Sequence, residues 1–188
     1  DTIFHYESKS PVFACQRLKN GNTFVGECVT GRMLEISPKG KIVKETCILP
    51  KGVKDGGFAF MRNARRLDNG HFLVAHYGDQ CVKEYDANGK MVWKLDVPGG
   101  PHSLTRLPNG HTLIAVADKD QNPRLIEVTP EGKTIWEISN ADIPGKPLKF
   151  LGGFQYFSDG RFLITNWTGH VNPKEKVHML LVDRQKKI

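Results

Sequence analysis

Apolar and polar positions along the chain repeat a pattern of two short strands joined by a tight turn. The sequence LTRLPNGHTLIAV places Asn-Gly between two apolar runs at Gly110, and related sequences surround Gly21, Gly70 and Gly160. Asn-Gly and Asp-Gly favour hairpins because such turns need positive φ angles. These glycines are 49, 40 and 50 residues apart, which is within the range of propeller blades. The spacing therefore predicts one repeated strand unit per interval.

The second strand of each hairpin is a continuous apolar run, as in residues 72–75 and 113–117. Such a run predicts burial on both faces of the strand. A second turn follows, SPKG, DANG or TPEG, and leads to a segment with an aromatic residue at a fixed place, as in Trp93 and Trp136. The pattern thus predicts four strands in each full repeat, which we call a, b, c and d. We expect the aromatic residues of strand d, which include Phe4, to pack between neighbouring blades.

These elements predict an all-β fold, a β-propeller of four-stranded antiparallel blades, with about four blades covered. We assign the repeats to residues 11–47, 61–96, 101–139 and 150–188, with residues 1–7 as an outer strand. Residues 1–188 are then a single propeller domain or a fragment of one. Residues 1–7 would complete the last blade in a four-bladed ring, but we favour a larger ring of which this chain covers four repeats.

Composition narrows the range of partners. The net charge is +7, yet the lysines are scattered and several follow turn glycines, so most of the charge is expected to be solvated. No basic run carries interleaved aromatic residues, which argues against nucleic acid as a partner. No apolar run approaches the roughly 18 residues of a membrane span. The four cysteines show no CxxC pair and no metal-ligand spacing, so we expect buried free thiols and no resident metal.

Propeller connectivity places the a–b and c–d turns on one face and the d–a and b–c loops on the other. The turns are short, and their face is expected to leave little room for chemistry. The longer segments are the entry loops 50–63, 97–103 and 141–153 and the b–c loops 116–123 and 165–173. Functional residues concentrate on such loops. The site is therefore predicted on the face that carries these loops, which we call the loop face.

A polar mouth on the loop face would collect the residues at the starts of the a strands and in the b–c loops. Arg62 favours an anionic group, and Trp167 would supply an apolar wall. The predicted ligand-binding residues are Arg62, Asn63, His76, Asp79, His102, Asp118, Asn166, Trp167 and His170.

Two other sets repeat on the turn side. His71 and His111 directly follow the a–b turns and are expected to be solvated. An arginine lies four residues before the turn glycine in every repeat but the last, which indicates a structural role for Arg17, Arg66 and Arg106.

The leading functional interpretation is a ligand-binding or scaffold propeller whose loop face holds a small polar ligand, with anions and carbohydrates as the candidate classes. One alternative is a transferase, lyase or hydrolase that uses His102 or His76 as a general base. The other is an interaction platform for a protein partner. The chain has no GxSxG motif, no phosphate-binding glycine-rich loop and no CxxCH motif, and nothing in it identifies a cofactor.

The repeat RLPNGHTLIAVAD followed by IEVTPEGKTIWEI resembles bacterial β-propellers of the PQQ-like and NHL-like families, over essentially the whole chain. Members of these families are commonly exported, so the resemblance implies a periplasmic or extracellular location. The pattern is also similar to that of arylsulfotransferase propellers, in which a histidine begins a blade before the turn. Only His102 matches that feature. The likeness indicates the fold more strongly than the chemistry.

Overall fold

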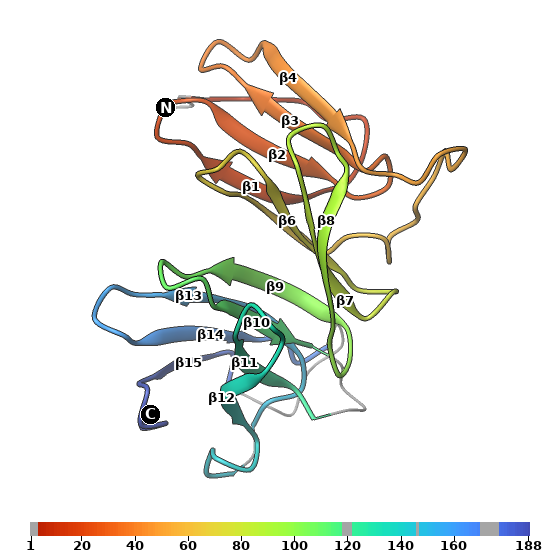
Figure 1. Cartoon of the computed structure of the whole chain (residues 1–188). Helices are drawn as coiled ribbons and strands as arrows, with labels where there is room; N and C mark the ends of the chain where they lie inside the picture. Colours follow the sequence, from red (N-terminus) through yellow and green to blue (C-terminus); the bar gives the residue numbers. More distant parts are fainter. Residues whose placement is uncertain (1–3, 118–121, 146, 170–176) are drawn as a thin grey trace. The chain divides into compact units, whose positions relative to one another are not determined.

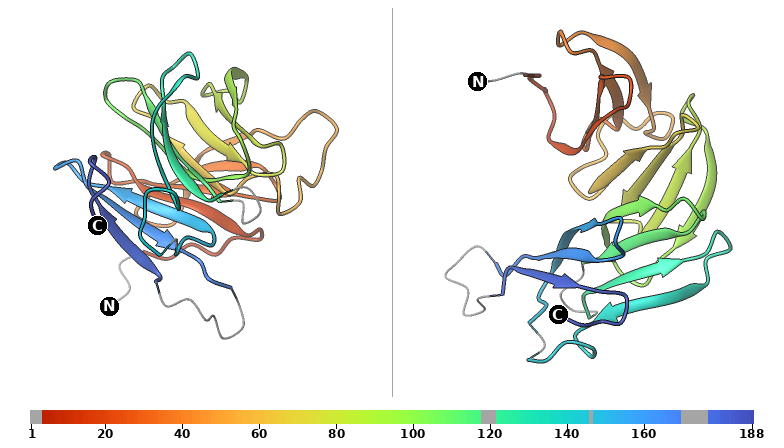
Figure 2. Two further views of the ribbon diagram at one scale, coloured as in Figure 1. Left: turned by 90° about the horizontal axis from the view of Figure 1, so that it is seen from below. Right: turned by 90° about the vertical axis from the view of Figure 1, so that its left-hand side faces the viewer.

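The computed structural model describes residues 4–117, 122–145, 147–169 and 177–188, and these residues form strands, turns and loops without a helix. The chain divides into two compact units, Asp1–Asp96 and Val97–Ile188. Each unit contains two antiparallel sheets, whose strands follow one another in chain order (Figures 1 and 2). The two units are treated separately below.

The first unit contains two four-stranded sheets. In each sheet every strand is antiparallel to its neighbours, so the chain meanders from the first strand to the fourth. The strands are β1 (Val12–Arg17), β2 (Thr23–Glu27), β3 (Arg32–Ile36), β4 (Ile42–Cys47), β5 (Asn63–Arg66), β6 (Phe72–His76), β7 (Cys81–Tyr85) and β8 (Met91–Asp96).

The second unit contains one four-stranded sheet and one sheet with three described strands. The same antiparallel meander joins them. The strands are β9 (Pro101–Arg106), β10 (Thr112–Val116), β11 (Arg124–Val128), β12 (Thr134–Ser139), β13 (Leu151–Tyr156), β14 (Phe162–Asn166) and β15 (Met179–Val182).

The second strand of each sheet forms the core, as its continuous apolar sequence predicts. Every residue of β2, β6 and β10 is buried. Strand β14 departs from the prediction, because Leu163 is only half-buried and Thr165 is exposed. Its other face is buried, since Phe162 and Ile164 join a cluster with Leu113 of β10. The prediction is therefore confirmed for three strands and for one face of β14.

Aromatic stacking joins the two sheets within each unit. Trp136 of β12 stacks on Phe162 of β14 with ring centroids 5.0 Å apart, and its Nε1 donates a hydrogen bond to the carbonyl of Arg184 at 3.0 Å. In the first unit Phe24 of β2 stacks on Phe72 of β6 at 5.8 Å. The contact of Trp136 confirms the packing predicted for the aromatic residue of strand d.

The arginines before the turn glycines hold those turns closed. Each donates a hydrogen bond from Nη1 to the carbonyl oxygen of the glycine four residues later. The guanidinium therefore satisfies a turn carbonyl, which supports the structural role assigned from the repeat. The three pairs are Arg17 with Gly21, Arg66 with Gly70, and Arg106 with Gly110.

The last repeat has Tyr156 where the others have this arginine, and another arginine supplies the missing guanidinium. Arg66 lies over the ring of Phe72, with Cζ 4.7 Å from the ring centroid. In the last sheet Arg184, from the turn after β15, lies over the equivalent ring of Phe162 at 4.9 Å. Both sheets thus have a guanidinium over the equivalent phenyl ring, although the arginine comes from a different place in the sequence.

The hairpin turns have the predicted geometry. Gly21, Gly70, Gly110 and Gly160 have φ angles of 83°, 86°, 85° and 89°. A β-carbon is disfavoured in this left-handed region, which explains why glycine follows Asn or Asp at each turn.

The outer strand predicted for residues 1–7 is not present in the part of it that the structure describes, residues 4–7. Phe4 and Tyr6 instead pack against a small buried cluster of the first sheet, Val25, Leu34 and Ile36. The segment is therefore held by side-chain burial on a sheet face and not by ladder hydrogen bonds.

The four cysteines are free, but only two of them match the prediction of buried thiols. Cys28 and Cys81 are buried, whereas Cys15 and Cys47 are exposed. Both exposed thiols lie on the first or last strand of the first sheet, where one strand face is open.

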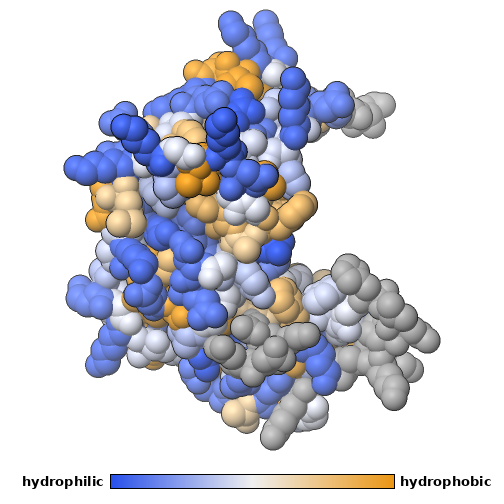
Figure 3. All heavy atoms as spheres, turned by 90° about the vertical axis from the view of Figure 1, so that its right-hand side faces the viewer, coloured by the Kyte–Doolittle hydropathy of each residue, from blue (hydrophilic) through white to orange (hydrophobic). Residues whose placement is uncertain are grey.

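No helix among the described residues is long and apolar enough to cross a membrane. Hydrophilic side chains cover much of the face drawn in Figure 3.

Candidate functional site

Arg62 lies directly before β5, between two aromatic rings. Its Cζ is 5.0 Å from the ring centroid of Phe13 and 5.4 Å from that of Tyr77. Its backbone N–H donates to the carbonyl of Ala75 at 3.0 Å, which ties the residue to β6. The Nε atom is buried and has no hydrogen-bond partner among the described residues, and no carboxylate in that part of the chain pairs with the guanidinium. Within the described ranges, the positive charge is therefore held in place without a counter-ion.

The entry loop that carries Arg62 is fixed to the neighbouring b–c turns. The N–H of Gly78 donates to the carbonyl of Ala59 at 2.8 Å, and the Cys28 thiol donates to the carbonyl of Met61, with Sγ 2.9 Å from the oxygen. A β-carbon at Gly78 would lie 3.0 Å from Cβ of Ala59, so the two segments approach as closely as glycine allows. These contacts fix the loop and so fix the backbone position of Arg62.

Two further polar residues of β5 are at least partly buried. Oδ1 of Asn63 is buried and has no hydrogen-bond partner among the described residues. Arg65 is half-buried, and burial lowers the pKa of its guanidinium. Sequence reasoning missed Arg65, because the repeat pattern drew attention to Arg66 beside it. A second consecutive arginine on a strand with a buried face was the available signal.

His76 does not reach the loop face as predicted, because it is completely buried. Its Nε2 lies 2.9 Å from the hydroxyl of Tyr85, and its ring packs edge-on against Phe60 with centroids 4.9 Å apart. Burial lowers the pKa of His76 to about 4, with a smaller contribution from Lys83. A neutral histidine that solvent does not reach is a core residue. The prediction of His76 as a general base on the loop face is therefore wrong.

Asp79 lies in the turn after β6 and points to solvent, with 60% of its side chain exposed. Its carboxylate is 2.7 Å from Nζ of Lys83, and this hydrogen bond lowers the pKa of Asp79. Asp79 is therefore an accessible group that already has a positive partner.

His102 belongs to an aromatic cluster in the second unit, with Phe150 at its centre. Its Nδ1 lies 2.7 Å from the carbonyl oxygen of Gly152, and its ring meets Phe150 edge-on at 5.1 Å. Phe150 in turn meets Trp167 edge-on at 5.4 Å, and 45% of Trp167 is exposed. A carbonyl can only accept, so Nδ1 carries the proton and Nε2 is the basic atom of the neutral ring. The structure thus brings His102 and Trp167 into one cluster.

Asn166 supports this cluster from inside the protein. It is buried, and its Oδ1 accepts hydrogen bonds from the backbone N–H groups of Lys149 and Phe150 at 2.8 and 3.3 Å. Its Nδ2 donates to the carbonyls of Pro147 and Val177 at 2.9 and 2.6 Å. The amide is fully used by backbone groups, so Asn166 positions the loops and does not face a ligand.

The remaining predicted residues, Asp118 and His170, lie outside the described residues. The first unit holds Arg62, Asn63 and Asp79, and the second holds His102 and Trp167. That the two groups share one mouth stays a prediction.

His71 and His111 are not simply solvated, contrary to expectation. Nδ1 of His71 lies 2.7 Å from Glu84, and Nδ1 of His111 lies 2.8 Å from Glu127. Both pairs join the residue after an a–b turn to a glutamate on strand c, and each histidine side chain is less than a third exposed. The histidine is therefore part of a cross-strand clamp. Arg184 also binds Glu127.

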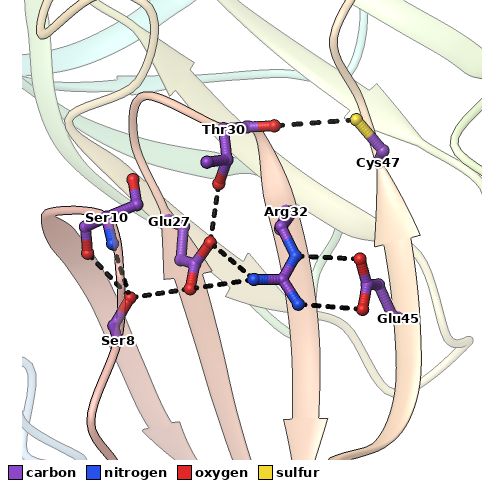
Figure 4. A network of polar contacts seen from close by, with 7 residues as sticks. All are labelled: Ser8, Ser10, Glu27, Thr30, Arg32, Glu45 and Cys47. Atoms are coloured by element: carbon purple, nitrogen blue, oxygen red, sulfur yellow. Dashed lines mark hydrogen bonds and ion pairs between the residues drawn. The ribbon is translucent and has the colours of Figure 1, made fainter. Parts of the chain in front are cut away.

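A buried carboxylate network at the end of β2 was not predicted (Figure 4). The Glu27 side chain is fully buried and accepts hydrogen bonds from Ser8 and Thr30 at 2.7 and 2.6 Å. Arg32 pairs with Glu27 at 3.2 Å and with Glu45 at 2.8 Å. The network ties residues 8–10 and the b–c turn to the first sheet. Its members are spread over separate strands, so no local motif pointed to it.

The turn side also has more room than expected. A surface groove of about 390 Å³ opens between the first two a–b turns. Lys19 and Asp68 form an exposed ion pair at 2.7 Å in its wall. The expectation fails because it counted the length of each turn and not the space between neighbouring turns. Among the described residues no group of three or more potential ligands could hold a metal ion.

Comparison with solved structures identifies the fold. A protein of unknown function from Bacteroides caccae matches with a TM-score of 0.79 and 23% identity, over 94% of this chain and 65% of that one. Virginiamycin B lyase from Staphylococcus aureus matches with a TM-score of 0.61 and 14% identity, over 97% and 59%. A catalytically inactive histidine-to-alanine variant of that lyase with quinupristin matches at 0.59 and 16%, over 92% and 55%.

These neighbours are β-propeller proteins, so the predicted fold class is confirmed: the chain is all-β and built from antiparallel propeller blades. It spans 55 to 65% of the length of these structures. At such identities the likeness concerns the fold alone. No protein-family model and no curated protein matches the chain.

Proposed function

We propose that this protein binds a small anionic ligand on the loop face, with Arg62 as the anion contact. The observation that carries the proposal is the guanidinium held between Phe13 and Tyr77 with a buried Nε atom that has no partner among the described residues. A guanidinium stays charged at any ordinary pH, and an uncompensated charge that is partly buried is costly. An incoming carboxylate, sulfate or phosphate would remove that cost.

Preorganisation strengthens the argument. The two rings already restrict the side chain of Arg62, so less rotamer entropy is lost when an anion binds. Planar guanidinium and carboxylate groups pair through two parallel hydrogen bonds, which makes such contacts directional. The fixed entry loop and the aromatic walls are typical of a binding site that exists before its ligand arrives.

Replacing Arg62 by Gln is expected to weaken anion binding about tenfold or more, because the charge-assisted hydrogen bonds are lost. Isothermal titration calorimetry with acetate, sulfate and glucuronate would measure this, with Arg62→Lys as the variant that keeps the charge. Arg161→Gln is the matched control, since Arg161 is exposed and paired with Asp159 at 2.7 Å. Equal binding of glucuronate by the wild type and Arg62→Gln would contradict the proposal.

A second function, supported by a different observation, is catalysis at His102. The carbonyl of Gly152 fixes the ring so that Nε2 is the basic atom, which suits a general base or acid. If the protein acts as a lyase, quinupristin is a first substrate to test, because a structural neighbour was solved with it. We expect mass spectrometry to show a new product with the wild type and none with His102→Ala. A product formed equally by both proteins would exclude His102.

A further inference from the structure

Phe58 presents an aromatic ring at the surface of the entry loop that carries Arg62. Its exposed fraction is 58%, although phenylalanine is among the residues most often buried. The backbone around it is fixed, because the N–H of Gly56 donates to the carbonyl of Val29 at 2.9 Å. The sulfur of Cys28 also lies 3.4 Å from the carbonyl oxygen of Phe58. The ring is therefore exposed on a segment whose backbone is held by the turn after β2.

Phe13 of β1 contacts both Phe58 and Arg62. The centroids of the two phenyl rings are 6.3 Å apart with their planes inclined at 54°, and Cζ of Arg62 is 5.0 Å from the Phe13 centroid. Phe13 is itself half-buried and packs against the core cluster that includes Phe24, which fixes its position from inside. Tyr77 contacts the same guanidinium at 5.4 Å. We call this set the aromatic–arginine cluster: Arg62, Phe13, Phe58 and Tyr77.

A small hydrophilic anion would use only part of this cluster. Sulfate or acetate would compensate the charge of Arg62 but would leave the ring of Phe58 in water. A carboxylate that carries an aromatic ring would pair with the guanidinium and also cover Phe58, and the apolar area that both rings then bury favours binding. Aromatic rings pair at centroid distances of about 4.5–7 Å, a range that includes the contact of Phe13 with Phe58, so a third ring can extend that pair.

The contacts also limit the length of the ligand. Arg62 and Phe58 both touch the ring of Phe13, so a molecule that reaches the guanidinium and the exposed ring needs only a short linker between its carboxylate and its own ring. Long flexible linkers would lose more conformational entropy on binding without gaining a contact in the cluster.

We infer that the anion site of the first unit takes a carboxylate with an aromatic ring on a short linker, Arg62 binding the carboxylate and Phe58 covering the ring. The inference rests on the proposed function of Arg62 and adds the apolar part of the ligand, which the guanidinium alone does not specify. Phe13 and Tyr77 restrain the guanidinium and so fix where the carboxylate binds.

Three small molecules separate the contribution of the ring from that of the charge: 3-phenylpropionate, propionate and the neutral 3-phenylpropanamide. Titrations followed by NMR or calorimetry give a Kd for each. We expect 3-phenylpropionate to bind the wild type about tenfold more tightly than propionate, because its ring is partly buried on Phe58. It should also bind more tightly than the amide, which lacks the charge-assisted hydrogen bonds.

Substitutions at Phe58 test the assignment of the ring. Phe58→Ala is expected to raise the Kd for 3-phenylpropionate about fivefold and to leave that for propionate unchanged. Phe58→Tyr, which keeps the ring, is expected to retain most of the preference for 3-phenylpropionate. Phe157→Ala is the matched control, since Phe157 is also exposed but lies in the turn after β13 of the second unit. It should match the wild type with all three ligands.

Two results would overturn the inference: equal binding of 3-phenylpropionate and propionate by the wild type, or the same Kd for 3-phenylpropionate in Phe58→Ala and the wild type. In either case weaker binding of propionate by Arg62→Gln would leave the proposed anion site standing. If Arg62→Gln binds both carboxylates as the wild type does, the proposed function fails together with the inference. Equal binding of 3-phenylpropanamide and 3-phenylpropionate by the wild type would contradict both as well, because the ring would then bind without an anion contact.

Discussion

Replacing Arg184 by Ala is expected to lower the free energy of unfolding by about 2–4 kcal/mol. Arg184 pairs with Glu127, whose side chain is only 4% exposed, and it also lies over the rings of Trp136 and Phe162 at 5.3 and 4.9 Å. Its removal would leave a buried carboxylate with His111 as its remaining described partner. The effect lies below that for a fully buried pair, because 30% of the Arg184 side chain is exposed. Urea denaturation of both proteins measures it.

The same contact predicts a pH dependence. Burial alone would raise the pKa of Glu127, but hydrogen bonds from Arg184 and His111 outweigh it and hold this pKa below 4.5, its ordinary value. A carboxyl with a lowered folded-state pKa stabilises the protein above its ordinary pKa, and this contribution is lost as the pH falls through the folded-state value. The difference between wild type and Arg184→Ala should therefore be full at neutral pH and shrink in acid.

Arg161→Ala is the control for this prediction. Arg161 pairs with Asp159 across a turn with both side chains about half exposed, and such exposed pairs contribute little to stability. A loss of stability in Arg184→Ala no larger than that in Arg161→Ala would show that the buried Glu127 does not depend on Arg184.

The strand pattern could be predicted because its causes are local. Neighbouring residues determine the positive φ at Gly70 and Gly110. They also form the continuous apolar runs, such as Leu113 to Val116. Residues 4–7 resemble the d strands in sequence but lack a strand in the structure. A strand needs a pairing edge as well as a pattern, and the sequence does not say which edge is available.

The candidate site was predicted less completely, because it depends on distances between strands. Arg62 was expected at the start of an a strand, but the aromatic contacts from Phe13 and Tyr77 come from other segments. His76 has the polar identity of a loop residue and yet lies in the core, where its Nε2 contacts the hydroxyl of Tyr85. Tyr156 appeared to break the arginine repeat, and only the fold shows that Arg184 replaces the missing group. When a residue far along the chain takes the place of a missing side chain, the local sequence does not reveal it.

Replacing Leu113 by Ala is expected to lower the free energy of unfolding by about 2–5 kcal/mol. Leu113 is completely buried in β10 and belongs to the cluster that joins the two sheets of the second unit, with Leu125 and Phe162 among its members. The substitution removes apolar surface and leaves a cavity that β-strands on both sides cannot close, because their registers are fixed by ladder hydrogen bonds. Thermal and urea unfolding would both report the loss.

Leu181→Ala separates this packing effect from the loss of a leucine as such. Leu181 lies on β15 of the same unit and is 42% exposed, so its truncation should cost about 1 kcal/mol or less. The expected order is wild type, then Leu181→Ala, then Leu113→Ala, with a clear gap before the last. If both variants unfolded at the same urea concentration, the continuous apolar run of β10 would not be the core of the second unit, and the burial argument that led from the sequence to the blades would be wrong.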